Sequence, residues 1–165
     1  MGLSIALLTI SDTRTLADDS SGDQLLRSLE AADHRLYERQ LCPDDRYQIR
    51  RELSRWIADP AVDVVITSGG TGLTGRDGTP EAVAPLLDKT IEGFGELFRV
   101  LSFESIGTST LQSRCLAGVA NGTFVFVLPG SLDAVTTAWN RLIRAQLDAD
   151  TRPCNLAQLR ARLKE

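Results

Sequence analysis

Hydrophobic residues along the chain alternate between short continuous runs and stretches with helical spacing. Uninterrupted apolar runs, typical of strands buried on both faces, occupy residues 4–11, 63–68 and 123–128. Between them, apolar residues recur at three- and four-residue intervals, as in residues 49–57, which predicts amphipathic helices. This alternation of strands and helices predicts an α/β fold with a mostly parallel sheet.

Two local signals refine this prediction. Ser21, with Gln24 three residues later, has the spacing of a capping box that opens a helix, and residues 34–42 are predicted as a more peripheral strand. The dipeptide Asn121-Gly122 lies between two apolar runs and is the strongest short signal for a hairpin. We therefore expect an antiparallel pair to join the otherwise parallel sheet.

The segment at residues 63–87 is interpreted as a strand, a loop and a helix. The loop at residues 69–78 is dense in glycine, and residues 79–81 supply an N-cap threonine, a first-turn proline and a first-turn acid. Such a loop can turn its amide groups toward one point, and the helix start adds positive dipole, so both favour a phosphate-like anion. Asp77 would repel that anion unless a cation such as Mg²⁺ lay between them. We therefore interpret Asp77 as a metal-facing residue.

The spacing of this loop fits neither standard nucleotide motif. It lacks the Gly-Lys-Ser/Thr of a P-loop. Its Gly70-x-Gly72-x-x-Gly75 pattern matches the dinucleotide fingerprint, but the following sequence does not read as the second strand that would carry the expected acid. A glycine-rich turn without a ligand remains the alternative to a phosphate site.

A second carboxylate is expected near this loop. One of Asp44 and Asp45 caps the helix after Pro43, which leaves the other free. Loops that leave the carboxyl ends of neighbouring parallel strands meet at one edge of a sheet, so Ser11-Asp12 and Asp44 should converge on the loop around Gly70. Asp44 is therefore a candidate second metal ligand.

Composition narrows the possible partners. The chain has 165 residues, with 18 Lys and Arg against 22 Asp and Glu, and we expect one domain over residues 1–165 and no nucleic-acid partner. Three cysteines far apart and a single histidine argue against a disulfide framework or a zinc site and favour a reducing compartment. Because no segment resembles a signal peptide or a membrane span, we expect a cytoplasmic protein without a membrane partner.

Two later segments carry further candidates. The apolar residues of the stripe at 94–101 are explained either as core or as a subunit contact. Residues 102–113 are rich in hydroxyls and are followed by Arg114; they either cap helices or line an anion site. The turn at residues 129–131, with its glycine and serine, opens another helix and offers more donors to the same anion.

Together these motifs resemble the MoaB/Mog family of molybdenum-cofactor biosynthesis proteins. The resemblance covers residues 5–155 and is carried by residues 68–82, with its Arg-Asp-x-Thr-Pro, and by residues 93–96, 101–103 and 129–131 with Ser113-Arg114. Residues 92–96, 106–114 and 148–155 look most like the bacterial MoaB branch.

The resemblance implies a three-layer α/β fold that binds molybdopterin. In active members, the terminal phosphate of molybdopterin attacks the α-phosphate of Mg-ATP, which releases pyrophosphate and leaves adenylylated molybdopterin. By motif, the two catalytic and metal-binding acids fall on Asp44 and Asp77. Substrate-binding positions fall on Ser11, Gly70, Thr71, Gly72, Ser102, Pro129, Gly130 and Ser131. The resemblance also implies a homotrimer or homohexamer, and a molybdenum-insertion protein is a candidate partner.

The sequence departs from active Mog-type members near the last turn. Val127 stands where they often carry Asn, and Leu132-Asp133 replaces Pro-Lys. Loss of a lysine and gain of an acid should weaken anion binding, although Asp133 also suits a helix N-terminus. Three hypotheses follow: a Mg²⁺- and ATP-dependent molybdopterin adenylyltransferase, which the presence of both acids favours; a non-catalytic molybdopterin-binding carrier or scaffold; and another phosphate-binding α/β protein.

Overall fold

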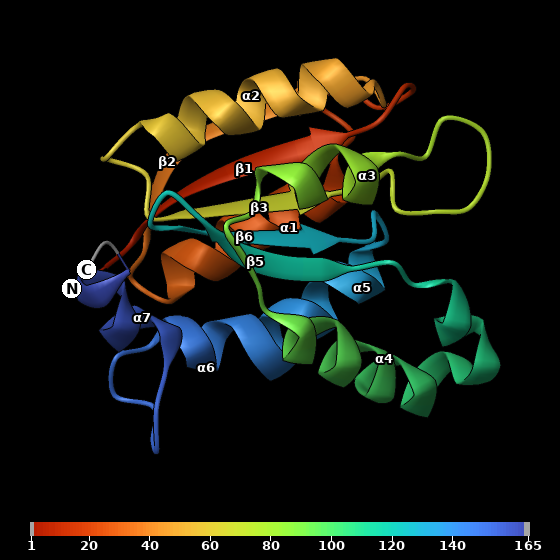
Figure 1. The fold of residues 1–165 in the computed structure, drawn as a ribbon. Coiled ribbons are helices and arrows are strands. Elements are labelled where there is room, and N and C mark those ends of the chain that lie inside the picture. The colour runs from red at the N-terminus through yellow and green to blue at the C-terminus, as the bar shows by residue number, and fades with distance from the viewer. Residues whose placement is uncertain (1, 164–165) are drawn as a thin grey trace.

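A six-stranded sheet forms the middle layer of the protein (Figure 1). The computed structural model describes residues 2–163. The strands are β1 (Ser4–Ile10), β2 (Arg35–Cys42), β3 (Val64–Ser68), β4 (Lys89–Thr90), β5 (Leu116–Ala120) and β6 (Thr123–Leu128). Their order is β2-β1-β3-β6-β5-β4, with β2, β1, β3 and β6 parallel and β5 and β4 antiparallel to their neighbours. The predicted mostly parallel sheet with an antiparallel hairpin is confirmed.

Helices cover both faces of this sheet, which gives three layers (Figure 1). The helices are α1 (Ser20–Ala31), α2 (Arg46–Ala58), α3 (Thr79–Val83), α4 (Glu92–Ile106), α5 (Leu132–Ala138), α6 (Arg144–Leu147) and α7 (Leu156–Leu159). Short 3₁₀ turns occupy Ala84–Leu86, Gly107–Gln112 and Arg160–Arg162, and a π turn at Trp139–Ile143 joins α5 to α6. Helices α2 and α3 pack on one face, and α1, α4, α5 and α6 pack on the other.

The continuous apolar runs are explained by burial on both faces. Along β1, Ile5 and Leu7 enter the core beneath α1, α4 and α5, whereas Leu8 and Ile10 enter the core beneath α2 and α3. All four side chains are at most 3% exposed. Fully burying one such side chain stabilises the fold by roughly 1.5–3 kcal/mol, so these runs hold the central strands between the two helical layers.

The predicted hairpin is confirmed, whereas the start of α1 and the edge strand β4 differ from the prediction. Asn121 and Gly122 have φ of 48° and 80°, and the hairpin lies where it was expected. The start of α1 was placed wrongly: the helix begins at Ser20, because the carboxylate of Asp19 accepts the amide of Gly22 at 3.0 Å and is the true cap. The short edge strand β4 was missed, since two residues carry no periodicity.

The stripe on α4 divides between the two explanations offered for it. Phe94 and Phe98 are buried against the sheet. Leu97 is 55% exposed and continues into an exposed apolar row along the outer side of α4. Members of this outer row are Leu97, Val100, Phe103 and Ile106. One side of the helix is therefore core, and the other side is free in the single chain.

Candidate functional site

The four parallel strands end at the same edge of the sheet, and their loops are joined there. The amide of Ser11, after β1, donates to the carbonyl of Cys42 at 3.0 Å, and the amide of Gly69, after β3, donates to the carbonyl of Leu128 at 3.0 Å. These bonds extend the sheet beyond the strand ends. They bring together the loops after β1, β2, β3 and β6, as the sequence predicted.

Glycine is required where the loop leaves β3. Gly69 and Gly70 have φ of +103° and +65°, a region that side chains disfavour. A Cβ at Gly69 would overlap the carbonyl oxygen of Ile10, and one at Gly70 would lie 2.7 Å from Asp44 Oδ2. A Cβ at Gly130 would lie 3.1 Å from the Cα of Gly69, so the turns after β3 and β6 touch through their main chains.

Asp44 is the free member of the Asp44-Asp45 pair. Asp45 is the N-cap of α2, because its carboxylate accepts the amides of Tyr47 and Gln48 at 3.0 and 2.9 Å. The amide of Asp44 donates to Asp12 Oδ1 at 3.0 Å, while the carboxylate of Asp44 faces Gly70. Asp44 is only 9% exposed, and its Oδ1 is buried without a hydrogen-bond partner. Such an orphaned oxygen is an available ligand for a cation.

Electrostatics at Asp44 also favour a bound cation. Burial raises the pKa of the Asp44 carboxyl above its usual value of 3.8, and the nearby carboxylates of Asp77 and Asp12 raise it further. The amide of Gly78 and the guanidinium of Arg76 oppose this rise in the pKa without cancelling it. The site thus gathers negative charge, which a metal ion would neutralise.

Asp77 lies on the other arm of the glycine loop. A Cβ at Gly72 would overlap Asp77 Oδ2, so this carboxylate lies directly against the backbone of Gly72. Asp44 and Asp77 therefore face Gly70 and Gly72 of the same loop. No cluster of three or more metal-ligating side chains occurs within residues 2–163. Two carboxylates fit Mg²⁺, which usually takes one or two protein acids and completes its shell with water and substrate phosphates.

Several predicted substrate residues have hydroxyls in use within the fold. Ser11 Oγ accepts the amides of Thr13 and Arg14 at 3.2 and 3.0 Å. Ser131 caps α5, because its Oγ accepts the amide of Ala134 at 3.2 Å. Thr71 is buried within the loop after β3, between Gly70 and Gly72. The backbones of these residues therefore sit at the common edge of the sheet.

The remaining predicted residues lie in two places. Pro129 and Gly130 form the turn between β6 and the cap of α5. The Gly130 carbonyl accepts from Ser21 Oγ at 2.8 Å, which fixes the direction of that turn. Ser102 lies on α4, in the layer beneath the sheet, and is 7% exposed. It is the predicted substrate residue farthest along the chain from any of the four converging loops.

Three arginines hold the loops at this edge; the sequence motifs include Arg76 and Arg114 without assigning them a contact, and Arg14 was not predicted. Arg76 Nε donates to the Asp44 carbonyl at 3.1 Å, and its Nη1 lies 3.6 Å from Asp12 Oδ2. Arg14 Nη1 donates to the Gly130 carbonyl at 3.2 Å, and Arg114 donates to carbonyls of the glycine loop. The only sequence signal for a role of Arg14 and Arg76 at this site is their position, because they lie in the same loops as Ser11 and Asp77.

Fold and site together define an α/β protein with a glycine-rich loop and two acids at the carboxyl edge of its sheet. Residues 6–149 match the family model described as "Probable molybdopterin binding domain". The chain belongs to the MoaB/Mog family of molybdenum-cofactor biosynthesis proteins. This confirms the resemblance seen in the sequence and places the chain in molybdenum cofactor biosynthesis.

Curated relatives agree with this assignment. Molybdenum cofactor biosynthesis protein B of Escherichia coli (strain K12) is 54% identical over 151 residues, which cover 92% of this chain and 89% of the relative. The protein of the same name from Staphylococcus carnosus (strain TM300) is 45% identical over 146 residues, covering 87% of this chain and 85% of that one. Both relatives are matched over most of their length.

Solved structures share the fold. A crystal structure of molybdenum cofactor biosynthesis protein B superposes with a TM-score of 0.89 at 39% identity, covering 99% of this chain and 97% of that chain. The tungsten cofactor synthesizing protein MoaB from Pyrococcus furiosus superposes with a TM-score of 0.77 at 34% identity, covering 86% and 90%. Across residues 2–163, no helix is long and apolar enough to cross a membrane.

Proposed function

We propose that the protein is a molybdopterin adenylyltransferase that uses Mg-ATP. In this reaction an oxygen of the terminal phosphate of molybdopterin attacks the α-phosphorus of ATP. The new P–O bond forms as the bond from the α-phosphorus to the bridging oxygen breaks, and pyrophosphate leaves with that electron pair. The products are adenylylated molybdopterin and pyrophosphate.

The observation that carries this proposal is a pair of acids from two different loops that face the same glycine loop. Asp44 and Asp77 face Gly70 and Gly72, and Asp44 Oδ1 is buried without a partner. A site that only held a phosphate would gain nothing from two carboxylates, because they repel the anion. Acids beside an anion site make sense where a cation joins them to a phosphate chain.

The chain's own groups have distinct roles in this proposal. Backbone amides of the loop after β3 and of the turn at Gly130 and Ser131 hold and orient the attacking phosphate. Asp44 and Asp77 would hold Mg²⁺, which supplies charge neutralisation as pyrophosphate leaves. Positioning and electrostatics carry most of the catalysis of phosphoryl-type transfers, so no side-chain nucleophile is required.

The departures from active Mog-type members have local explanations. Val127 is fully buried in the core beneath α2 and α3, so this strand position serves packing. Asp133 lies in the first turn of α5, where an acid stabilises the helix N-terminus. Arg14 and Arg76 supply positive charge at the same edge, which offsets the lysine that is missing there.

One experiment separates catalysis from binding alone. Purified protein is incubated with molybdopterin, ATP and Mg²⁺, and adenylylated pterin and pyrophosphate are measured alongside bound pterin. We expect both products in equal amounts and none when Mg²⁺ is removed with EDTA. Bound pterin without either product would favour a carrier or scaffold, and no pterin binding would leave only another phosphate-binding role.

We further propose that the functional unit is a homotrimer or homohexamer. The outer row of α4, Leu97 to Ile106, presents four large apolar side chains that are 48–61% exposed in the single chain. Contiguous exposed apolar surface of this kind is typical of a protein–protein contact. A molybdenum-insertion protein is a further candidate partner. Its copurification with the assembled oligomer would test this.

A further inference from the structure

Arg114 joins the two arms of the glycine loop from outside it. The residue lies between the 3₁₀ turn at Gly107–Gln112 and β5. Its Nε donates to the Thr71 carbonyl at 3.0 Å, and its Nη2 donates to the carbonyls of Gly72 at 2.6 Å and Asp77 at 3.4 Å. Thr71 and Gly72 belong to the outgoing arm of the loop and Asp77 to the returning arm, so one guanidinium closes the loop at its base.

These bonds determine which way the loop amides point. In a trans peptide the C=O and the following N–H point in opposite directions. The carbonyls of Thr71 and Gly72 point to Arg114, so the amides of Gly72 and Leu73 point away from it. The amides are thereby left as donors for an anion, while the carbonyls, which would repel the anion, are neutralised.

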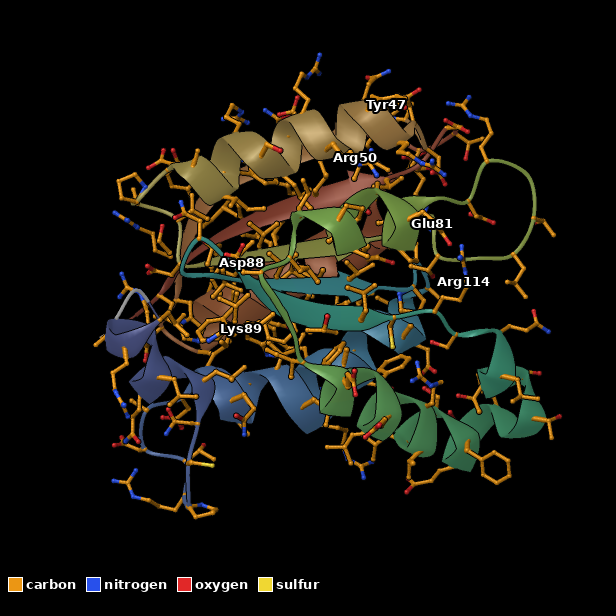
Figure 2. All side chains as sticks on the ribbon, viewed as in Figure 1. Tyr47, Arg50, Glu81, Asp88, Lys89 and Arg114 are labelled. Carbon is orange, nitrogen blue, oxygen red and sulfur yellow. The ribbon has the colours of Figure 1, made fainter. Side chains whose placement is uncertain are left out.

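The far end of Arg114 is anchored in the opposite layer of the fold. Its Nη1 forms an ion pair with Glu81 Oε1 in the first turn of α3, and Figure 2 shows these two side chains approaching each other beside the loop. The carbonyl of Glu81 in turn accepts from Arg50 Nη2 on α2 at 3.0 Å. The guanidinium is therefore held in place by elements outside the loop.

Arg114 has little capacity left to bind a phosphate directly. An arginine side chain carries five N–H groups. The acceptors of Arg114 are the carbonyls of Thr71, Gly72 and Asp77 and the carboxylate of Glu81, which together occupy four of these groups. Its influence on a ligand must therefore pass mainly through the loop.

We propose that Arg114, backed by Glu81, is a positioning residue that sets the amides of the glycine loop and the backbone of Asp77 for the incoming phosphate. The identity of that phosphate, the terminal group of molybdopterin, rests on the proposed function. The geometry of the loop does not depend on the proposed function.

Three variants test this role. Arg114→Gln removes the charge and the fork of donors, and Arg114→Lys keeps the charge but cannot reach carbonyls on both arms. Arg55→Gln is the matched control, because Arg55 on α2 pairs with Glu38 on β2 and Glu52 on α2, away from the loop. Hydrogen exchange of the hydrogen-bonded loop amides of Asp77 and Thr79 is measured without ligand, followed by molybdopterin affinity, kcat and KM.

We expect faster exchange in both Arg114 variants at the amides of Asp77 and Thr79, which donate to the carbonyls of Thr74 and Gly70, with the exchange of the central strands unchanged. We expect kcat to fall by roughly tenfold to a hundredfold, which is what small misplacements of positioned groups cost. Molybdopterin affinity should fall, KM for ATP should change less than kcat, and lysine should rescue only part of the loss. Arg55→Gln should match the wild-type protein in all of these measurements.

Unchanged exchange of the loop in Arg114→Gln would overturn the proposal, as would faster exchange with unchanged pterin affinity and turnover. Full rescue by lysine would also overturn it, since charge alone would then suffice. If the wild-type protein binds molybdopterin but never adenylylates it, the proposed function fails. Loop exchange and pterin affinity then decide the role of Arg114 independently.

Discussion

Asp12 and Asp44 are linked by a 3.0 Å hydrogen bond in which the Asp44 amide donates to Asp12 Oδ1. The second oxygen of Asp12 lies 3.6 Å from Arg76 Nη1. Both oxygens of Asp12 therefore have partners, whereas Asp44 Oδ1 has none. Both acids lie at the same edge of the sheet. Asp12 holds the backbone of Asp44 in place, whereas the carboxylate of Asp44 remains available to a cation.

This division of roles predicts different outcomes for two changes at Asp12. Asp12→Asn keeps an oxygen acceptor for the Asp44 amide, so turnover should stay within a fewfold of wild type. Asp12→Ala removes the acceptor and leaves the Asp44 backbone unanchored, so we expect a loss of roughly tenfold or more. Steady-state kinetics with both variants measures the difference. Equal losses in the two variants would indicate that the charge of Asp12 acts directly.

Changes at the two proposed metal ligands, Asp44 and Asp77, should lower turnover far more than a change at the neighbouring Asp45. In Asp44→Asn and Asp77→Asn, pterin binding should persist while turnover falls by roughly 10²–10³-fold, the usual cost of losing a charge-stabilising group. Asp45→Asn is the matched control, because asparagine is an equally good N-cap for α2. Its turnover should be close to wild type. Normal activity in both Asp44→Asn and Asp77→Asn would remove the metal role.

Asp44 should lower the stability of the metal-free protein at neutral pH. The folded pKa of Asp44 is raised above the ordinary 3.8, so between these two values the folded protein binds more protons than the unfolded chain. Stability is therefore lost as pH rises through that window, and the ionised carboxylate remains unfavourable above it. Asp44→Asn should then raise Tm at pH 7, and the difference from wild type should shrink as the pH falls below 3.8, where both states of Asp44 are protonated.

Metal addition supplies the complementary measurement. Mg²⁺ that binds only the folded state stabilises it by mass action, so it should raise the Tm of wild type and not that of Asp44→Asn. Calorimetry at pH 7, with EDTA or with Mg²⁺, compares the two proteins. A lower Tm for Asp44→Asn in EDTA would contradict this account of the Asp44 environment.

Glycine at position 72 should matter for activity more than for folding. A Cβ there would overlap Asp77 Oδ2, and Gly72 does not need a positive φ, so Gly72→Ala can fold by moving the carboxylate. We expect a Tm within a few degrees of wild type and roughly tenfold or greater loss of turnover. Gly93→Ala, where a Cβ meets open space, is the control and should leave turnover unchanged. Wild-type kinetics in Gly72→Ala would show that the position of Asp77 is not critical.

Assembly should depend on the outer row of α4. Leu97→Glu combined with Val100→Glu places two charges on this surface and should shift a trimer or hexamer toward monomer in sedimentation velocity. Leu16→Glu is a suitable control, since Leu16 is 53% exposed in the loop between β1 and α1, away from α4. An unchanged sedimentation coefficient in the α4 variant would move the interface elsewhere.

The sequence predicted the sheet and the meeting of its loops because both follow from general rules. Runs such as residues 123–128 can be buried on two faces only in a covered sheet, and parallel strands bring their carboxyl ends to one edge. Asp45 could be distinguished from Asp44 only in the structure, because both have capping chemistry and the choice depends on which carboxylate reaches the amides of Tyr47 and Gln48.

Long-range side-chain contacts were beyond the reach of the sequence. The cap of α1 is Asp19, which also accepts from Thr9 Oγ1 at 2.6 Å on β1 and pairs with Arg39 on β2. Nothing in the local spacing around Ser21 encodes these partners. The same holds for Arg114, whose acceptors lie 33–43 positions away along the chain. Such contacts depend on how the layers stack.

The touching main chains of Gly69 and Gly130 impose a mechanical constraint on the whole edge. No side chain separates them, and the Gly69 amide donates to the Leu128 carbonyl at 3.0 Å, so we expect a shift in one turn to be transmitted to the other. The spacing between the two turns is thus built into the backbone. We therefore expect the side chains around these two turns, and not the spacing of the turns themselves, to determine which substrate the protein prefers.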